Sequence, residues 1–185
     1  MAQDTYEIRS CNPKANTNLL WIGGSCGAGL AHRDCFELAK DGAIAWQAAI
    51  QWDLFCSPFK SQLVWKEANA ALFGSHGEVY ALDLHTGAVL FHQTLGSYFG
   101  SFEIDPIHHL LLVLTGEEIL AFNQQLELLW AARGLAVDGI VCHEIGETLT
   151  VDAEMDPPGG WQRVTIDLDS GAELTRESKP RSRRP

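Results

Sequence analysis

The sequence lacks long hydrophobic runs. No stretch of its 185 residues approaches the roughly 18 to 20 consecutive apolar residues that a membrane-spanning helix needs. The N-terminal segment MAQDTYEIRS has neither the basic start nor the apolar segment of a signal peptide. We therefore expect a cytoplasmic protein without a membrane partner. An apolar content of 46% still indicates a globular chain rather than a disordered one.

Cysteine pairs at metal-binding spacing are also absent. The five cysteines form an odd set without a CxxC motif, which argues against a zinc ribbon and against a disulfide framework. The glycine-rich segment GGSCGAG (23–29) lacks the Lys-Ser/Thr pair of a phosphate-binding loop. No calcium loop of the EF-hand type occurs, and the adjacent His108 and His109 would point to opposite faces of a strand. The sequence therefore predicts no catalytic residues, no metal site and no cofactor.

Positive charge is scarce outside the C-terminal end. Residues 1–175 contain 8 basic and 23 acidic side chains, a net charge of −15, whereas residues 176–185 carry +4. An acidic body repels phosphate backbones and attracts basic partners. We expect a basic protein partner and no nucleic-acid partner. The polar, proline-containing segment 176–185 predicts a disordered tail behind a single domain that spans residues 1–175.

The sequence does contain a repeated hairpin pattern. Two strand-like runs flank a turn in CFELAKDGAIAW (35–46), VYALDLHTGAVLF (79–91), ILAFNQQLELLW (119–130) and RVTIDLDSGAEL (163–174). Gly42, Gly87 and Gly171 stand at three of these turns, where glycine tolerates a positive φ, and the third copy has NQQ (123–125) instead. Alanines in the first copy favour a helix, but the Asp-Gly pair interrupts it. We predict a β-hairpin in all four copies.

Two further strand-like runs precede each hairpin. The nearer ones are NLLWIG (18–23), NAALFGS (69–75), HLLLVLTG (109–116) and ETLTVDA (147–153), and the farther ones are TYEIRS (5–10), FCSPFK (55–60), YFGSFEI (98–104) and GIVCHEI (139–145). Each unit of about 40 to 45 residues then has four strands, which is the signature of a propeller blade. A sandwich of antiparallel strands is the alternative. The turns recur after 45, about 38 and about 46 residues, which favours the propeller.

The predicted fold is therefore all-β, with four four-stranded repeats. They form either a small four-bladed β-propeller or half of a dimeric eight-bladed ring. The second arrangement requires a homodimer. Alternation predicts a core of Leu20, Phe36, Ile44, Leu72, Tyr80, Leu82, Leu90, Leu112, Leu114, Leu120, Phe122, Leu129, Leu149, Val151 and Ile166.

The hairpins YALDLHTGAVLF and TIDLDSGAEL resemble the outer hairpins of PQQ-like repeats, the blade of quinoprotein-type β-propellers. Segment 104–123 is similar to blades of NHL and YVTN-type propellers. The resemblance covers most of the chain and rests on apolar alternation, glycine turns and one aspartate per hairpin. It implies a propeller fold. Quinoprotein propellers form larger rings with a tryptophan docking motif in each blade. Here Trp46 and Trp130 end their hairpins, while Phe91 and Thr175 take the equivalent places.

Aromatic and acidic residues coincide in the connections that this alignment places on one rim of the ring. They are Trp52, Asp53, His76, Tyr98, Phe99, Asp138, Met155, Asp156 and Trp161. Aromatic side chains supply much of the energy of protein interfaces, and carboxylates steer charged partners. The alternative is that half of these aromatic side chains fold back over the core.

These features favour a non-enzymatic protein-binding module. One concrete form is an immunity- or inhibitor-type protein whose acidic body holds a basic partner. The alternative is a small β-propeller enzyme, a hydrolase or lyase with its active site in the channel. A third hypothesis is a structural subunit that closes an eight-bladed ring as a dimer.

Overall fold

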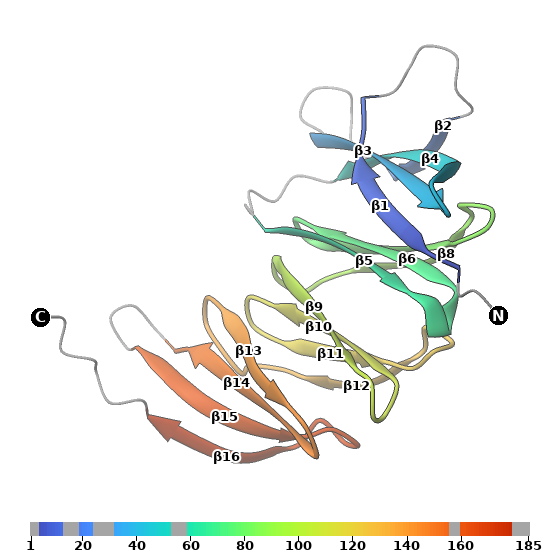
Figure 1. Cartoon of the computed structure of the whole chain (residues 1–185). Helices are drawn as coiled ribbons and strands as arrows, with labels where there is room; N and C mark the ends of the chain where they lie inside the picture. Colours follow the sequence, from blue (N-terminus) through green and yellow to red (C-terminus); the bar gives the residue numbers. More distant parts are fainter. Residues whose placement is uncertain (1–3, 13–18, 24–31, 53–58, 156–159, 179–185) are drawn as a thin grey trace, which may run out of the picture. The chain divides into compact units, whose positions relative to one another are not determined.

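The computed structural model describes residues 4–12, 19–23, 32–52, 59–155 and 160–178. These residues form sixteen β-strands and one short 3₁₀ helix (Lys66–Ala68), and none of them lies in an α-helix. The strands make four sheets of four strands each (Figure 1). The prediction of an all-β chain with four four-stranded repeats is confirmed. Within the described ranges, no helix is long and apolar enough to cross a membrane.

The chain divides into two compact units, Met1–Leu95 (unit 1) and Gly96–Pro185 (unit 2). Each unit contains two sheets and an apolar core of its own. The prediction of one domain over residues 1–175 stays a prediction. The last strand continues to Ser178, so that three residues assigned to the tail are part of the folded chain, while 179–185 lie outside the described residues.

The first sheet of unit 1 departs from the predicted strand order. Its strands are β1 (Tyr6–Ser10), β2 (Leu19–Gly23), β3 (His32–Lys40) and β4 (Ala43–Trp52). They are ordered β1-β3-β4-β2, and β2 pairs in parallel with β4. The hairpin β3-β4 was predictable because Asp-Gly favours a two-residue turn in which both residues have a positive φ. Asp41 and Gly42 form this turn, with φ of 51° and 82°. Eight residues separate β2 from β1, and eight separate it from β3, and the alternation of apolar and polar residues does not specify which strand β2 pairs with.

The second sheet of unit 1 follows the predicted order, with one shifted strand. Its strands are β5 (Lys60–Trp65), β6 (Ala70–Ser75), β7 (Glu78–Asp83) and β8 (Val89–Thr94), in the order β5-β6-β7-β8. Of the first strand predicted at 55–60, Lys60 is in the strand and Phe59 is not, while 55–58 lie outside the described residues. The strand continues instead to the buried Trp65.

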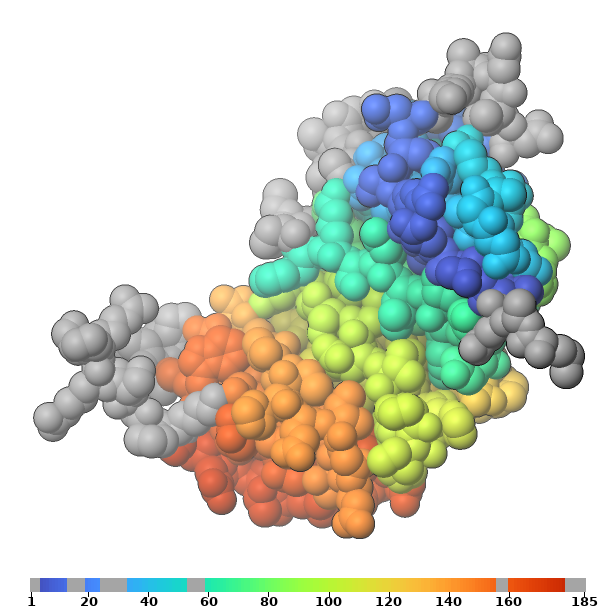
Figure 2. Space-filling view, viewed as in Figure 1, coloured from blue at the N-terminus to red at the C-terminus, as the bar shows by residue number. Residues whose placement is uncertain are grey.

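Both sheets of unit 2 have the predicted order. The third sheet contains β9 (Phe99–Asp105), β10 (Leu110–Thr115), β11 (Ile119–Phe122) and β12 (Leu128–Ala132). The fourth contains β13 (Ile140–Ile145), β14 (Thr148–Glu154), β15 (Trp161–Asp167) and β16 (Glu173–Ser178). Strand β13, orange in Figure 2, lies beside β9, which is yellow-green. The first strands of the two sheets in this unit are therefore neighbours.

Each core combines side chains from both sheets of its unit. Most of the predicted core residues are buried: Phe36, Leu72, Tyr80, Leu82, Leu112, Leu114, Leu120, Phe122, Leu149, Val151 and Ile166. Leu20 is partly buried and packs against the core of unit 1. The prediction is wrong for Ile44, Leu90 and Leu129, which are exposed. Leu129 precedes the buried Trp130, and neighbouring residues of a strand point to opposite faces. Ile44 is separated from the buried Trp46 by a register shift.

Trp46 connects the two sheets of unit 1. It lies in β4, and its indole N–H donates a hydrogen bond to the carbonyl oxygen of Leu84, which follows β7, at 3.2 Å. A Cβ built on Gly87, in the same turn, would lie 3.1 Å from the indole. Gly87 also has a φ of 70°. Glycine is therefore required both for the backbone conformation and for the close approach of the indole.

Unit 2 repeats this arrangement with Trp130. The indole N–H donates to the carbonyl oxygen of Leu168 at 2.7 Å. A Cβ on Gly171 would lie 2.5 Å from the indole, and Gly171 has a φ of 71°. Among the described residues, each unit therefore has a tryptophan whose indole N–H bonds to a turn carbonyl of its second sheet.

An aspartate orders the turn of each of these two hairpins. The carboxylate of Asp83 accepts hydrogen bonds from the backbone N–H groups of His85 and Thr86 and from the Thr86 hydroxyl. Burial by itself raises the pKa of Asp83, but these hydrogen bonds together outweigh it and lower the pKa. The hydroxyl and N–H of Ser170 lower the pKa of Asp167 in the same way. The repeated aspartate is thus a turn residue.

We expect Gly171→Ala to lower the free energy of unfolding by about 1–3 kcal/mol more than Gly42→Ala does. Both glycines have a positive φ, so both substitutions carry the same kind of backbone strain. A Cβ on Gly42 meets nothing within 4 Å, whereas one on Gly171 meets Trp130. Urea unfolding of the two variants measures the difference. Equal losses would show that the indole does not press on the turn.

Candidate functional site

The structure distributes the residues predicted for partner binding over both units. Trp52 and His76 lie in unit 1, and Tyr98, Phe99, Asp138, Met155 and Trp161 lie in unit 2. Asp53 and Asp156 lie outside the described residues.

Four chain segments meet at one end of the sheets of unit 2. Tyr98 directly precedes β9, Asp138 and Gly139 directly precede β13, and Glu154 ends β14 opposite Trp161, the first residue of β15. Antiparallel pairing places the start of one strand beside the end of the next, which explains why these residues share an end. We call Tyr98, Asp138, Gly139, Glu154 and Trp161 the acidic aromatic surface.

The side chains of this surface gather around Gly139. A Cβ at this glycine would lie 3.6 Å from the indole of Trp161 and 3.7 Å from both the Glu154 carboxylate and the Tyr98 hydroxyl. The Tyr98 hydroxyl donates a hydrogen bond to the backbone carbonyl of Asp138. The Trp161 side chain stays accessible, with 37% of the residue exposed. An indole, a phenol and a carboxylate therefore surround a stretch of backbone that carries no side chain.

Three carboxylates act on the Tyr98 hydroxyl. Burial raises the pKa of the Tyr98 hydroxyl, and the charges of Asp138, Glu154 and Glu117 raise it further. Glu154, Gly139 and Glu117 were not among the predicted binding residues. Extending the run ETLTVDA by one residue would have placed Glu154 opposite Trp161, because the two strands pair antiparallel.

Several of the predicted residues are not exposed anchors. Phe99 is fully buried, with its ring centroid 4.7 Å from that of Phe102. Trp52 and His76 are also buried. The sulfur of Met155, which is half-buried, accepts a hydrogen bond from Arg176 at 3.0 Å. The alternative that some loop aromatic side chains fold back over the core applies to Trp52 and Phe99.

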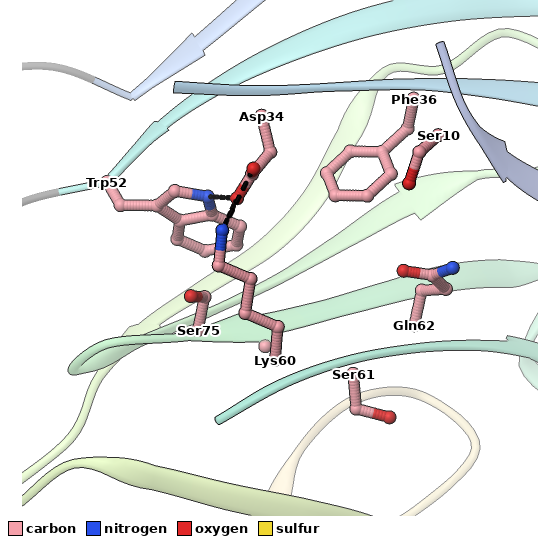
Figure 3. A pocket seen from close by; sticks show the side chains of 9 residues that line it. Ser10, Asp34, Phe36, Trp52, Lys60, Ser61, Gln62 and Ser75 are labelled. Atoms are coloured by element: carbon pink, nitrogen blue, oxygen red, sulfur yellow. Dashed lines mark hydrogen bonds and ion pairs between the residues drawn. The ribbon is translucent and has the colours of Figure 1, made fainter. Parts of the chain in front are cut away.

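Unit 1 contains a pocket of about 290 Å³ at the ends of its strands (Figure 3). Asp34 of β3 lines it, and its carboxylate accepts hydrogen bonds from the Trp52 indole at 2.9 Å and from the Lys60 ammonium at 2.8 Å. Asp34 and Lys60 were not among the predicted binding residues, because the pairing of β3 with β4 and the start of β5 bring them together. The lining residues are Ser10, Asp34, Phe36, Trp52, Lys60, Ser61, Gln62, Gly74 and Ser75.

A stack of rings supports the Trp52 wall of the pocket. The indole lies nearly parallel to the ring of His76, with 6.4 Å between the ring centroids. His76 is buried, has a φ of 55° in the turn after β6, and shares a 2.6 Å hydrogen bond between its Nδ1 and the Ser75 hydroxyl. Tyr80 packs edge-on against Trp52 at 5.6 Å. These contacts hold the indole in one orientation.

The described cysteines do not favour nucleophilic chemistry. Cys11, Cys35 and Cys142 are free thiols. Burial, and then the charge of Glu103, raises the pKa of Cys142 to about 11. Burial likewise raises the pKa of Cys11, with smaller contributions from Glu37 and Cys35. The thiols of Cys11 and Cys142 are therefore protonated at neutral pH, and the thiol is a far weaker nucleophile than the thiolate.

No family model and no curated protein matches this sequence. Among solved structures, the chain is similar to the computationally designed Ika4 protein, with a TM-score of 0.53 and 14% identity, over 70% of this chain and 78% of that one. It is also similar to BamB from Moraxella catarrhalis, with a TM-score of 0.53 and 15% identity, over 81% of this chain and 46% of BamB. BamB is a PQQ-like β-propeller, so the fold-level resemblance to these repeats is supported. The chain has a propeller-like fold.

Proposed function

We propose that the protein is a non-enzymatic binding module that holds a basic protein partner on its acidic aromatic surface. The observation that carries this proposal is the position of the exposed Trp161 beside Tyr98 and the Glu154 carboxylate, all around Gly139. A cytoplasmic location is part of the same proposal.

The chemistry of this surface suits an arginine or lysine side chain of the partner. A guanidinium or ammonium group is attracted to the face of an indole, and the attraction is strongest for tryptophan. The same group can form a charge-assisted hydrogen bond with Glu154. Tryptophan and tyrosine are also enriched among the residues that dominate interface energies. One partner cation can therefore use the ring and the carboxylate together.

The net charge of the protein supports the choice of a basic partner. Residues 1–175 carry −15, so the field of the whole body favours the approach of a positively charged surface. An immunity- or inhibitor-type protein that neutralises a basic enzyme is the concrete form that we propose, because such a role needs an acidic surface and no catalytic residues.

We expect Trp161→Ala to raise the dissociation rate of the partner by an amount equivalent to roughly 2 kcal/mol. The test starts with capture of basic proteins from a native lysate on the immobilised protein, followed by surface plasmon resonance with the captured partner. Trp21→Ala is the matched control, because Trp21 is an exposed tryptophan of β2 in unit 1. Glu154→Gln removes the carboxylate charge and leaves the ring in place.

Salt provides the second arm of this test. Exposed charges are screened over about 8 Å at physiological ionic strength, so a several-fold rise in salt should slow association more than it speeds dissociation. Binding that is indifferent to salt, and equal for wild type, Trp161→Ala and Glu154→Gln, would assign the partner to another surface.

A further inference from the structure

Neutral polar groups border much of the pocket of unit 1. The hydroxyl of Ser10, at the end of β1, lines it together with the amide of Gln62, in β5. Hydroxyls both donate and accept hydrogen bonds, and an amide offers both kinds of group. In Figure 3, Ser10 and Gln62 lie on one side of the Asp34 and Lys60 pair and Ser75 lies on the other.

The ion pair in this pocket cancels its own charge. The ammonium of Lys60 lies 2.9 Å and 2.8 Å from the two carboxylate oxygens of Asp34. A charged ligand that approaches either ion also meets the opposite charge at nearly the same distance, so the two Coulomb energies largely offset each other. A hydroxyl group can donate to the carboxylate and accept from the ammonium. The pair therefore favours neutral, hydroxyl-bearing ligands over anions and cations.

Aromatic rings supply an apolar wall beside these polar groups. Phe36 lines the pocket, and its ring centroid lies 4.7 Å from that of Phe73 in the core. Trp52 is fixed by its hydrogen bond to Asp34 and by its stacking on His76. Walls held in this way lose little conformational entropy when a ligand binds. Phe36 is 7% and Trp52 1% exposed, so these rings offer only a small apolar area to a ligand, and the polar groups carry the recognition of its hydroxyls.

The volume limits the size of the ligand. About 290 Å³ lies just below the range of roughly 300–1,000 Å³ for small-molecule sites, so only a small ligand fits. We propose that this pocket binds a neutral polyhydroxylated ligand of the size of one sugar ring. The site lies within unit 1, and it is independent of the acidic aromatic surface of unit 2.

The test is a titration of the whole protein with glucose, galactose, mannose, N-acetylglucosamine and myo-inositol in turn. Saturation-transfer NMR detects the contact of ring C–H groups with the protein, and calorimetry gives the Kd. We expect at least one of these compounds to bind with a Kd of about 1 mM or lower. Inorganic phosphate, acetate and methylammonium, titrated in the same way, should bind at least about tenfold more weakly.

Two variants assign the binding to this pocket. Gln62→Ala and Ser10→Ala each remove a hydrogen-bonding group from an exposed residue, and each should raise the Kd about fivefold. Gln125→Ala, at an exposed turn position in unit 2, is the control and should leave the Kd unchanged. Melting curves check that all three variants are folded. The proposal is overturned if none of the five compounds binds at about 50 mM, if the charged probes bind more tightly, or if both pocket variants bind like wild type.

Discussion

Replacing Trp130 by alanine is expected to lower the free energy of unfolding by about 3–5 kcal/mol. Trp130 is 8% exposed and belongs to the core of unit 2. Its loss leaves a cavity over Gly171 and removes the donor to the Leu168 carbonyl in that turn. Urea unfolding followed by circular dichroism measures the change.

Leu129 supplies the matched control for this experiment. It precedes Trp130 in β12 and is 53% exposed, so that Leu129→Ala should change the free energy of unfolding by no more than about 0.5 kcal/mol. Trp130→Phe keeps a ring over the turn but lacks the N–H, and it should fall between wild type and Trp130→Ala. Similar losses for Leu129→Ala and Trp130→Ala would contradict the docking of the indole on the turn.

The turn glycines show which part of this contact could be predicted from the sequence. The repeated pattern indicated correctly that Gly42, Gly87 and Gly171 occupy hairpin turns with positive φ. It did not distinguish Gly42, which has open space around its Cα, from Gly171, which lies against an indole. Positive φ is a local property of the turn. The indole arrives from the preceding sheet, and its contact depends on how two sheets pack.

The third hairpin shows how a turn can form without glycine. The side-chain oxygen of Asn123 accepts hydrogen bonds from the backbone N–H groups of Gln125 and Glu127. This asparagine takes the place that aspartate has in the second and fourth hairpins. Leu126 has the positive φ, at 63°. Leucine rarely adopts this conformation, so sequence patterns do not point to it.

The candidate site was predictable only where the strand order was predicted correctly. In unit 2 the four strands of each sheet follow one another, so the alignment placed Tyr98, Asp138 and Trp161 at a common end. In unit 1, β2 was predicted between β1 and β3, but it lies at the edge of its sheet, beside β4. The alternation of apolar and polar residues also does not predict that Trp52 is buried. Its indole N–H is paired inside the protein by the carboxylate of Asp34, which lies in another strand.

Replacing Leu112 by alanine is expected to lower the free energy of unfolding by about 2–5 kcal/mol. Leu112 lies in β10, is fully buried, and belongs to the core that both sheets of unit 2 share. The substitution removes several methyl and methylene groups from that core, and the ladders with β9 and β11 limit how far the backbone can relax to fill the space. The whole stability of a domain is about 5–15 kcal/mol, so the loss should be large in thermal and urea unfolding.

Leu128→Ala is the matched control, because Leu128 lies in β12 of the same sheet and is 49% exposed. A melting temperature that Leu112→Ala leaves unchanged, or that falls equally with Leu128→Ala, would show that β10 does not face the core as described.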